Sequence, residues 1–95
     1  MKIETTVSGQ TATIRLEGWL DTQTAPELGQ AVEALDNNVT DIVLEFEKLE
    51  YISSAGLRQI VAIYKKAHSL VICHVSSEIM DVFKMTGFDK RLNIQ

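Results

Sequence analysis

The spacing of apolar residues along this 95-residue chain constrains its fold more than any other feature. Near the N-terminus, apolar or β-branched residues occupy every second position, which is the period of a strand with one buried face. The two runs with this period are Ile3, Thr5, Val7 and Ala12, Ile14, Leu16. The segment Ser8-Gly9-Gln10 between them supplies a turn, and Gly18 ends the second run. These residues therefore predict an N-terminal β-hairpin.

After Gly18 the apolar residues change to the spacing of a helix. Thr24 is expected to be the N-cap of this helix, with Pro26 in the first turn and Glu27 completing a capping box. The apolar stripe of the helix consists of Leu28, Ala31, Val32 and Leu35. The polar segment Asp36-Asn37-Asn38 is expected to end it.

A strand and a helix follow. The nearly continuous apolar run Asp41–Phe46 predicts a buried strand. A helix is then expected to begin at Ser53-Ser54. The residues expected on its inward side are Leu57, Ile60, Val61, Tyr64 and Ala67. Lys65, Lys66 and His68 near its end complement the negative pole of the helix dipole.

The same alternation continues to the C-terminus. The apolar run Leu70–Val75 predicts another buried strand, and Ser76-Ser77 are expected to cap a third helix. The residues expected to face inward from this helix are Ile79, Val82, Phe83 and Phe88. Gly87 is expected to be its C-cap, and Leu92–Ile94 to add a short last strand.

This order predicts an α/β fold with a small mixed β-sheet, in which an N-terminal antiparallel hairpin precedes parallel strands, and with three or four helices. Residues 1–95 are expected to form a single domain. Right-handed crossovers would place both connecting helices on one face of the sheet. Helix starts then gather beyond the carboxyl ends of the strands, where α/β proteins place their sites. The polar residues expected at that edge are Asp21, Ser53, Ser54 and Ser76.

Composition excludes several classes of partner. The net charge of −4 gives no basic surface for nucleic acid, and no apolar run approaches the roughly 20 residues that a membrane helix needs. We therefore expect no nucleic-acid partner and no direct membrane insertion. The N-terminal segment MKIETTVSG lacks the apolar core of a secretory signal, and the lone Cys73 fits a reducing compartment. A cytoplasmic location is expected.

The two serines at the start of the second helix are the most distinctive polar residues. At such a position a hydroxyl caps free backbone amides, and a phosphate is also favourable. Ser53 and Ser54 allow a division of labour, in which one caps the helix and the other is presented. Ala55 and Gly56 are too small to shield them. This arrangement suits docking and covalent switching better than catalysis.

The segment Leu49–Arg58, which reads LEYISSAGLR, resembles the signature of the STAS domain, in particular that of the bacterial anti-sigma factor antagonists. The usual form of that signature is Asp-Ser-(Ser/Thr)-Gly-Leu after a hydrophobic pair. Here Tyr51-Ile52 supply the pair and Ser53-Ser54-Ala55-Gly56-Leu57 the remainder. Two other segments resemble the family in the same order: Glu17–Asp21, similar to its Gly-x-(Leu/Ile)-Asp turn, and Phe83–Phe88, similar to its closing helix and glycine.

The resemblance implies a STAS-like fold and a regulatory binding module without catalytic residues. Ser54 matches the serine that partner kinases of the family phosphorylate, and Ser53 is the reserve acceptor because it stands where the family has aspartate. The residues implied in partner binding are Asp21, Thr22, Ser53, Ala55, Gly56, Leu57 and Arg58. The implied partners are a serine-kinase anti-sigma factor and a serine phosphatase. ATP and magnesium would belong to the kinase, so no cofactor or metal is expected in this chain.

The resemblance also allows a second function within the same fold. STAS domains also serve as accessory subunits of membrane transport ATPases, which they dock on without phosphorylation. An enzyme with Ser54 as its nucleophile is not expected, because the Gly-x-Ser-x-Gly elbow is missing and no histidine is placed by sequence to act as the base.

Seven other side chains have simpler interpretations. Trp19, an aromatic residue on a loop, is expected to plug the core, and a contact anchor is the alternative. The carboxylates of Glu45, Glu47 and Glu50 are expected along a solvated strand edge and not in a metal site. His74 is expected to face solvent from a strand, and His68, Cys73 and His74 do not have the spacing of metal ligands.

Overall fold

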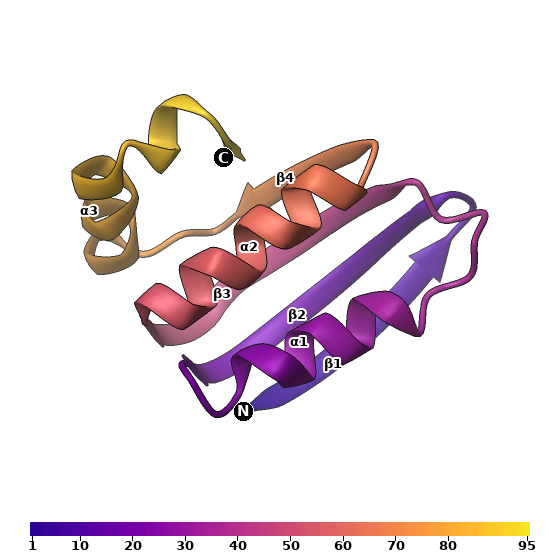
Figure 1. Cartoon of the computed structure of the whole chain (residues 1–95), viewed down its shortest axis with the longest axis horizontal. Coiled ribbons are helices and arrows are strands. Elements are labelled where there is room, and N and C mark those ends of the chain that lie inside the picture. Colours follow the sequence, from indigo (N-terminus) through magenta and orange to yellow (C-terminus); the bar gives the residue numbers. More distant parts are fainter.

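The computed structural model describes residues 1–95, and its five strands form one sheet in the order β1-β2-β3-β4-β5 (Figure 1). The strands are β1 (Lys2–Ser8), β2 (Thr11–Leu20), β3 (Asp41–Ile52), β4 (Ser69–Cys73) and β5 (Asn93–Ile94). β1 pairs antiparallel with β2, and all other neighbours are parallel. The predicted mixed sheet is confirmed, including the hairpin and the short last strand.

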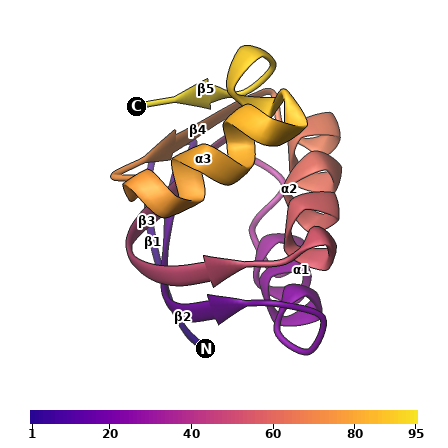
Figure 2. The same cartoon turned by 90° about the vertical axis from the view of Figure 1, so that its left-hand side faces the viewer.

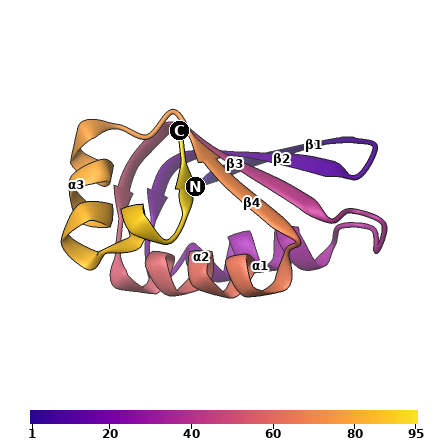
Figure 3. The same ribbon diagram turned by 90° about the horizontal axis from the view of Figure 1, so that it is seen from above.

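Three α-helices and one 3-10 helix connect the strands. They are α1 (Ala25–Glu33), α2 (Ser54–Lys66), α3 (Ser77–Thr86) and η1 (Phe88–Lys90). α1 and α2 lie on the same face of the sheet, as right-handed crossovers between neighbouring parallel strands require (Figure 3). α3 lies at the end of the molecule beyond β4, and Figure 2 looks onto that end. None of these helices combines the length and the apolar character needed to cross a membrane.

The core lies between the sheet and the helices and contains no buried charged or polar residue. Residues of β2 alternate between this core and the opposite face, which carries Arg15 and Glu17. The rings of Phe46 in β3 and Phe83 in α3 stack at 6.4 Å between centroids, which fixes α3 against the sheet. One face of the sheet is therefore covered by α1 and α2, and the other is left open (Figure 3).

β3 is longer than the sequence predicted, since it continues beyond Phe46 to Ile52. Its pairing with β2 shifts by one residue at two places, so each shift adds an unpaired residue to β3. These bulges space the buried residues Phe46, Leu49 and Ile52 three apart. The two-residue period that identifies a strand is lost there, which is why the predicted strand ends at Phe46.

β2 also extends further than predicted. It runs through Gly18 to Leu20, and Gly18, with φ +107°, lies at one of the register shifts instead of ending the strand. β4, in contrast, ends at Cys73 and not at Val75, because His74 leaves the extended conformation with φ +56°.

The inward side of α2 was only partly predicted. Leu57 and Ile60 are buried as expected, but Ile63 takes the third core position. Tyr64 is 48% exposed and Val61 only half-buried, because the stripe that faces the sheet lies one residue earlier at that turn. In α3, Ile79 and Phe83 are buried, and Gly87 ends the helix in the left-handed conformation with φ +79°, as predicted.

Candidate functional site

Two polar turns meet where β2 and β3 end. Leu20 and Ile52 are paired in the sheet, and the amide of Ser53 donates to the carbonyl of Leu20 at 2.9 Å. Gly56, in the first turn of α2, packs directly on this point. A Cβ atom at Gly56 would lie only 2.8 Å from the Leu20 carbonyl oxygen. The absence of a side chain at residue 56 therefore lets α2 begin beside the turn that follows β2.

Asp21 organises the first turn. Its Oδ1 accepts hydrogen bonds from the amides of Gln23 (3.0 Å) and Thr24 (3.1 Å). These donors, the Thr24 amide foremost, hold the pKa of the Asp21 carboxyl below its ordinary value. The turn thus presents a fixed negative charge at neutral pH, next to the exposed side chain of Thr22.

The predicted capping box of α1 does not form. Thr24 occupies the N-cap position, but its side chain makes no capping hydrogen bond. Its Oγ1 donates to the carbonyl of Trp19 at 2.7 Å and accepts from the amide of Asp21 at 2.8 Å. Thr24 therefore ties the turn to the end of β2, and its amide donates to Asp21 instead of to Glu27, the acceptor that a capping box would use.

The two serines of the second turn have different environments. Ser53 is the N-cap of α2, and its Oγ accepts a hydrogen bond from the amide of Gly56 at 3.3 Å. Ser54 is the first helical residue, is exposed, and makes no side-chain hydrogen bond within the chain. One serine thus satisfies the helix end, while the hydroxyl of the other is accessible.

The start of α2 is electropositive. Its first turn contains no acidic residue, so the positive end of the helix dipole is not neutralised there. Arg58 is exposed one turn after Ser54, at the i+4 position whose side chain lies on the same side of the helix. A shallow groove extends from these two residues along α2, lined also by Leu57, Val61, Ala62, Lys65 and Phe88.

An exposed aromatic pair flanks the two turns. Trp19 and Tyr51 are 56% and 45% exposed, and their ring centroids lie 5.0 Å apart. The prediction that Trp19 fills the core is wrong. It follows Arg15 and Glu17 in the alternation along β2, so it shares their open face, whereas Leu20 is buried. That alternation, continued past Gly18, was the signal that could have located it.

The remaining predicted site residues lie beneath the two turns or at the same end of the sheet. Ala55 is half-buried, and Gly56 and Leu57 are buried, so the last two support the surface from beneath. Ser76 is at the same end of the sheet but caps α3, where its Oγ accepts from the amide of Ile79 at 3.3 Å. It makes no hydrogen bond to the serine turn.

Comparisons with known proteins agree with this architecture. The family model of the STAS domain matches residues 2–95. An anti-sigma-B factor antagonist of Staphylococcus aureus is 29% identical over 99 residues, which span 99% of this chain and 92% of that protein.

Two solved structures share the fold. An anti-sigma factor antagonist from Mycobacterium paratuberculosis superposes with a TM-score of 0.86 at 22% identity, covering 98% of this chain and 83% of that one. The phosphorylated form of SpoIIAA from Bacillus superposes with a TM-score of 0.68 at 21% identity, covering 99% of this chain and 91% of that one. Since the family model spans nearly the whole sequence, this chain belongs to the STAS domain family, as its motifs predicted.

Proposed function

We propose that this protein is an anti-sigma factor antagonist whose affinity for its partner is switched by phosphorylation of Ser54. Unmodified, it binds a serine-kinase anti-sigma factor, which then releases its sigma factor for transcription. The kinase, which supplies ATP and magnesium, transfers a phosphoryl group to Ser54 and releases the phosphorylated protein. A serine phosphatase restores the binding form. The observation that carries this proposal is the exposed, unbonded hydroxyl of Ser54 beside the capping Ser53.

The surface around Ser54 is suited to docking a protein. Trp19 and Tyr51 offer exposed aromatic area, and aromatic residues are enriched among the residues that dominate interface energies. Asp21 adds a fixed negative charge and Arg58 a positive one, which can set the orientation of a partner. The names of the Staphylococcus aureus relative and the Mycobacterium structure support an anti-sigma factor as that partner.

The folded domain should tolerate the phosphate. A phosphoserine carries roughly −1.5 to −2 charges at pH 7. On Ser54 this charge lies at the positive end of α2, which stabilises an exposed anion by about 0.3–1 kcal/mol. Arg58 is one helical turn away and can pair with it. SpoIIAA, which shares the fold, has been solved in a phosphorylated form.

The complex with the partner should not tolerate a phosphate on Ser54. A phosphate covered by a partner that offers no cation loses its hydration, and an unpaired buried charge costs about 3–5 kcal/mol. A micromolar complex has a binding free energy of only about −8 kcal/mol. The penalty at the interface therefore exceeds the small gain within the domain, and the modified protein dissociates while it stays folded.

The test is phosphorylation by a cognate kinase with magnesium and ATP, followed by mapping of the modified residue by mass spectrometry. We expect one phosphate on Ser54, full modification of Ser53→Ala, and none of Ser54→Ala. Failure of the wild-type protein to accept phosphate at either Ser54 or Ser53 would refute the proposal, and phosphate on Ser53 alone would refute the assignment of Ser54 as the acceptor. Binding to the kinase without any transfer would instead favour a docking module of the kind that serves transport ATPases.

A further inference from the structure

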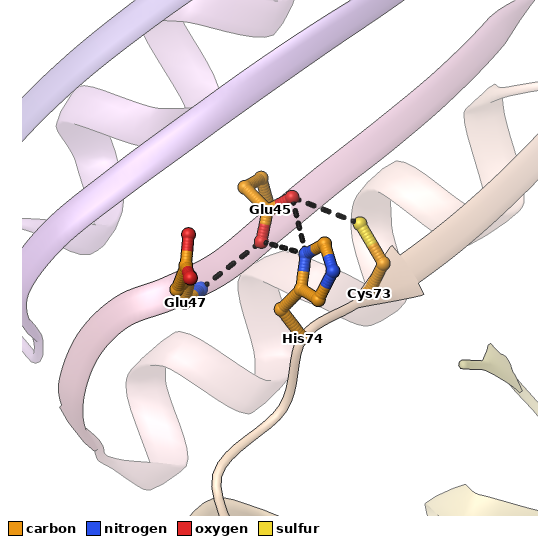
Figure 4. A network of polar contacts seen from close by, with 4 residues as sticks. All are labelled: Glu45, Glu47, Cys73 and His74. Carbon is orange, nitrogen blue, oxygen red and sulfur yellow. Dashed lines mark hydrogen bonds and ion pairs between the residues drawn. The ribbon is translucent and has the colours of Figure 1, made fainter.

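Three potential metal ligands meet on the open face of the sheet, and none belongs to the site around Ser54 (Figure 4). Glu45 of β3 and Cys73 of β4 are paired in the sheet, and the Cys73 thiol donates to Glu45 Oε2 at 3.3 Å. Nδ1 of His74 lies 2.7 Å from both carboxylate oxygens of Glu45. One donor atom from each of the three lies within 4.8 Å of the others.

The backbone at His74 creates this cluster. Consecutive residues of a strand point to opposite faces, so Cys73 and His74 would not normally share a contact. His74 has φ +56°, and it is the one non-glycine residue of the chain with positive φ. This left-handed conformation costs roughly 1–2 kcal/mol for a residue with a Cβ atom. It returns the imidazole to the side of the sheet where the carboxylate and the thiol already lie (Figure 4).

We propose that Glu45, Cys73 and His74 form a binding site for a zinc ion, with a fourth position open to water. Thiolate, imidazole and carboxylate are the three side-chain ligands that zinc takes in proteins, at about 2.3, 2.0–2.1 and 2.0–2.2 Å respectively. Tetrahedral bonds of these lengths place the ligand atoms about 3.3–3.7 Å apart. The contacts at Glu45 need to open by roughly 1 Å or less to admit the ion.

The neighbours of the cluster favour such a site. The amide of Glu47 donates to Glu45 Oε1 at 3.1 Å and orients the carboxylate, as outer-shell donors of metal ligands do. The side chain of Glu45 is only 18% exposed, whereas that of His74 is 65% exposed and leaves a path from solvent. The nearby cation, Arg15, is paired with Glu45 in the sheet, but its guanidinium donates to Thr6 on β1 at 3.0 Å and forms no ion pair with the Glu45 carboxylate.

The thiol favours zinc over magnesium or calcium, which take oxygen ligands. Burial and the carboxylate of Glu45 raise the pKa of Cys73 to about 11, so the metal-free thiol keeps its proton. Binding of zinc displaces that proton to solvent and also requires Nδ1 of His74 to be free of its proton, so that the neutral imidazole carries its one proton on Nε2. The positive charge of the ion then lies beside the carboxylate.

The experiment uses untagged, reduced protein freed of metal by a chelator. Zinc is titrated calorimetrically, and Co²⁺ is titrated with absorbance detection. We expect one ion per chain and, with cobalt, a near-ultraviolet thiolate-to-metal charge-transfer band. Absence of saturable binding by the wild-type protein overturns the proposal.

Three variants remove one ligand each: Glu45→Gln, Cys73→Ser and His74→Asn. Asparagine tolerates the left-handed conformation at residue 74, so the backbone is kept. Each should weaken zinc binding by at least about tenfold. The matched controls Glu50→Gln and His68→Asn, which change exposed residues outside the cluster, should bind as the wild type does. Wild-type affinity in folded Cys73→Ser or His74→Asn, checked by circular dichroism, contradicts the assignment.

Discussion

Ser53 and Ser54 are adjacent in the chain, yet only the side chain of Ser53 makes a hydrogen bond within the protein. Its Oγ accepts from the amide of Gly56, while the hydroxyl of Ser54 is exposed. The two roles can be separated by mutation. Ser53→Ala should lower the free energy of unfolding by about 0.5–2 kcal/mol, because an N-cap is lost. Ser54→Ala should leave it within about 0.5 kcal/mol, as an exposed substitution does. Urea unfolding measures both, and a larger loss from Ser54→Ala would contradict the assignment of the cap.

Gly56→Ala should destabilise the protein by about 1–3 kcal/mol. The added methyl group would lie 2.8 Å from the carbonyl oxygen and 2.9 Å from Cγ of Leu20, the last residue of β2. Gly29→Ala is the matched control, because there the nearest atoms belong to the flexible side chain of Gln59. We expect that variant to be as stable as the wild type or more stable, since alanine favours a helix. Equal effects of the two variants in thermal unfolding would exclude the close contact.

The Asp21 turn should contribute a pH-dependent part of the stability. The amide of Thr24 lowers the pKa of the Asp21 carboxyl in the folded protein. Such a group stabilises the fold above the pKa of the unfolded chain, and this contribution is lost as the pH falls through the folded value. The wild type should therefore exceed Asp21→Asn in stability at neutral pH, and the difference should shrink below the ordinary value of 3.8.

Urea unfolding of both proteins across this pH range tests the prediction. Asp36→Asn, at an exposed residue after α1, is the control and should follow the wild type throughout. A constant difference between Asp21→Asn and the wild type at every pH would show that the carboxylate is not the titrating group.

The aromatic pair should act on binding more than on stability. Trp19→Ala and Tyr51→Ala should each weaken the complex with the kinase by about 2 kcal/mol or more, roughly thirtyfold, as interface hot spots do. Tyr64→Ala is the control, because Tyr64 is similarly exposed but lies ten residues, about 15 Å, further along α2 than Ser54. Surface plasmon resonance measures all three, and equal losses would argue against a docking role for Trp19 and Tyr51.

Much of this architecture could be predicted because local patterns and global packing agree in most elements. The alternation in β2, the stripe of α1 and the glycine after α3 each matched the packing that the structure shows. β1 forms the predicted strand, but its alternation did not predict burial, since only Ile3 is half-buried and Val7 is 51% exposed. The predicted length of β3 was too short, because the two bulges of the strand break the alternation at Leu49–Ile52. Sequence reasoning therefore failed where the sheet departs from regular pairing.

The site was predicted unevenly for a related reason. Ser53 and Ser54 lie within one motif, so their position at a helix start follows from the sequence. The hydrogen bonds of Asp21 to the amides of Gln23 and Thr24 accompany a bond from the Thr24 hydroxyl to the Trp19 carbonyl, which no spacing in the sequence reveals. Likewise, Glu45 and His74 are 29 residues apart, and only strand pairing and one left-handed residue bring them together.

The most direct test of the switch compares the affinity of the unmodified and the Ser54-phosphorylated protein for the kinase by calorimetry, with thermal unfolding of both forms alongside. A desolvation penalty of about 3 kcal/mol or more predicts at least a hundredfold weaker binding of the phosphorylated form. Its melting temperature should equal or exceed that of the unmodified protein. Equal affinities, or weaker binding accompanied by unfolding of the phosphorylated domain, would contradict the proposed mechanism.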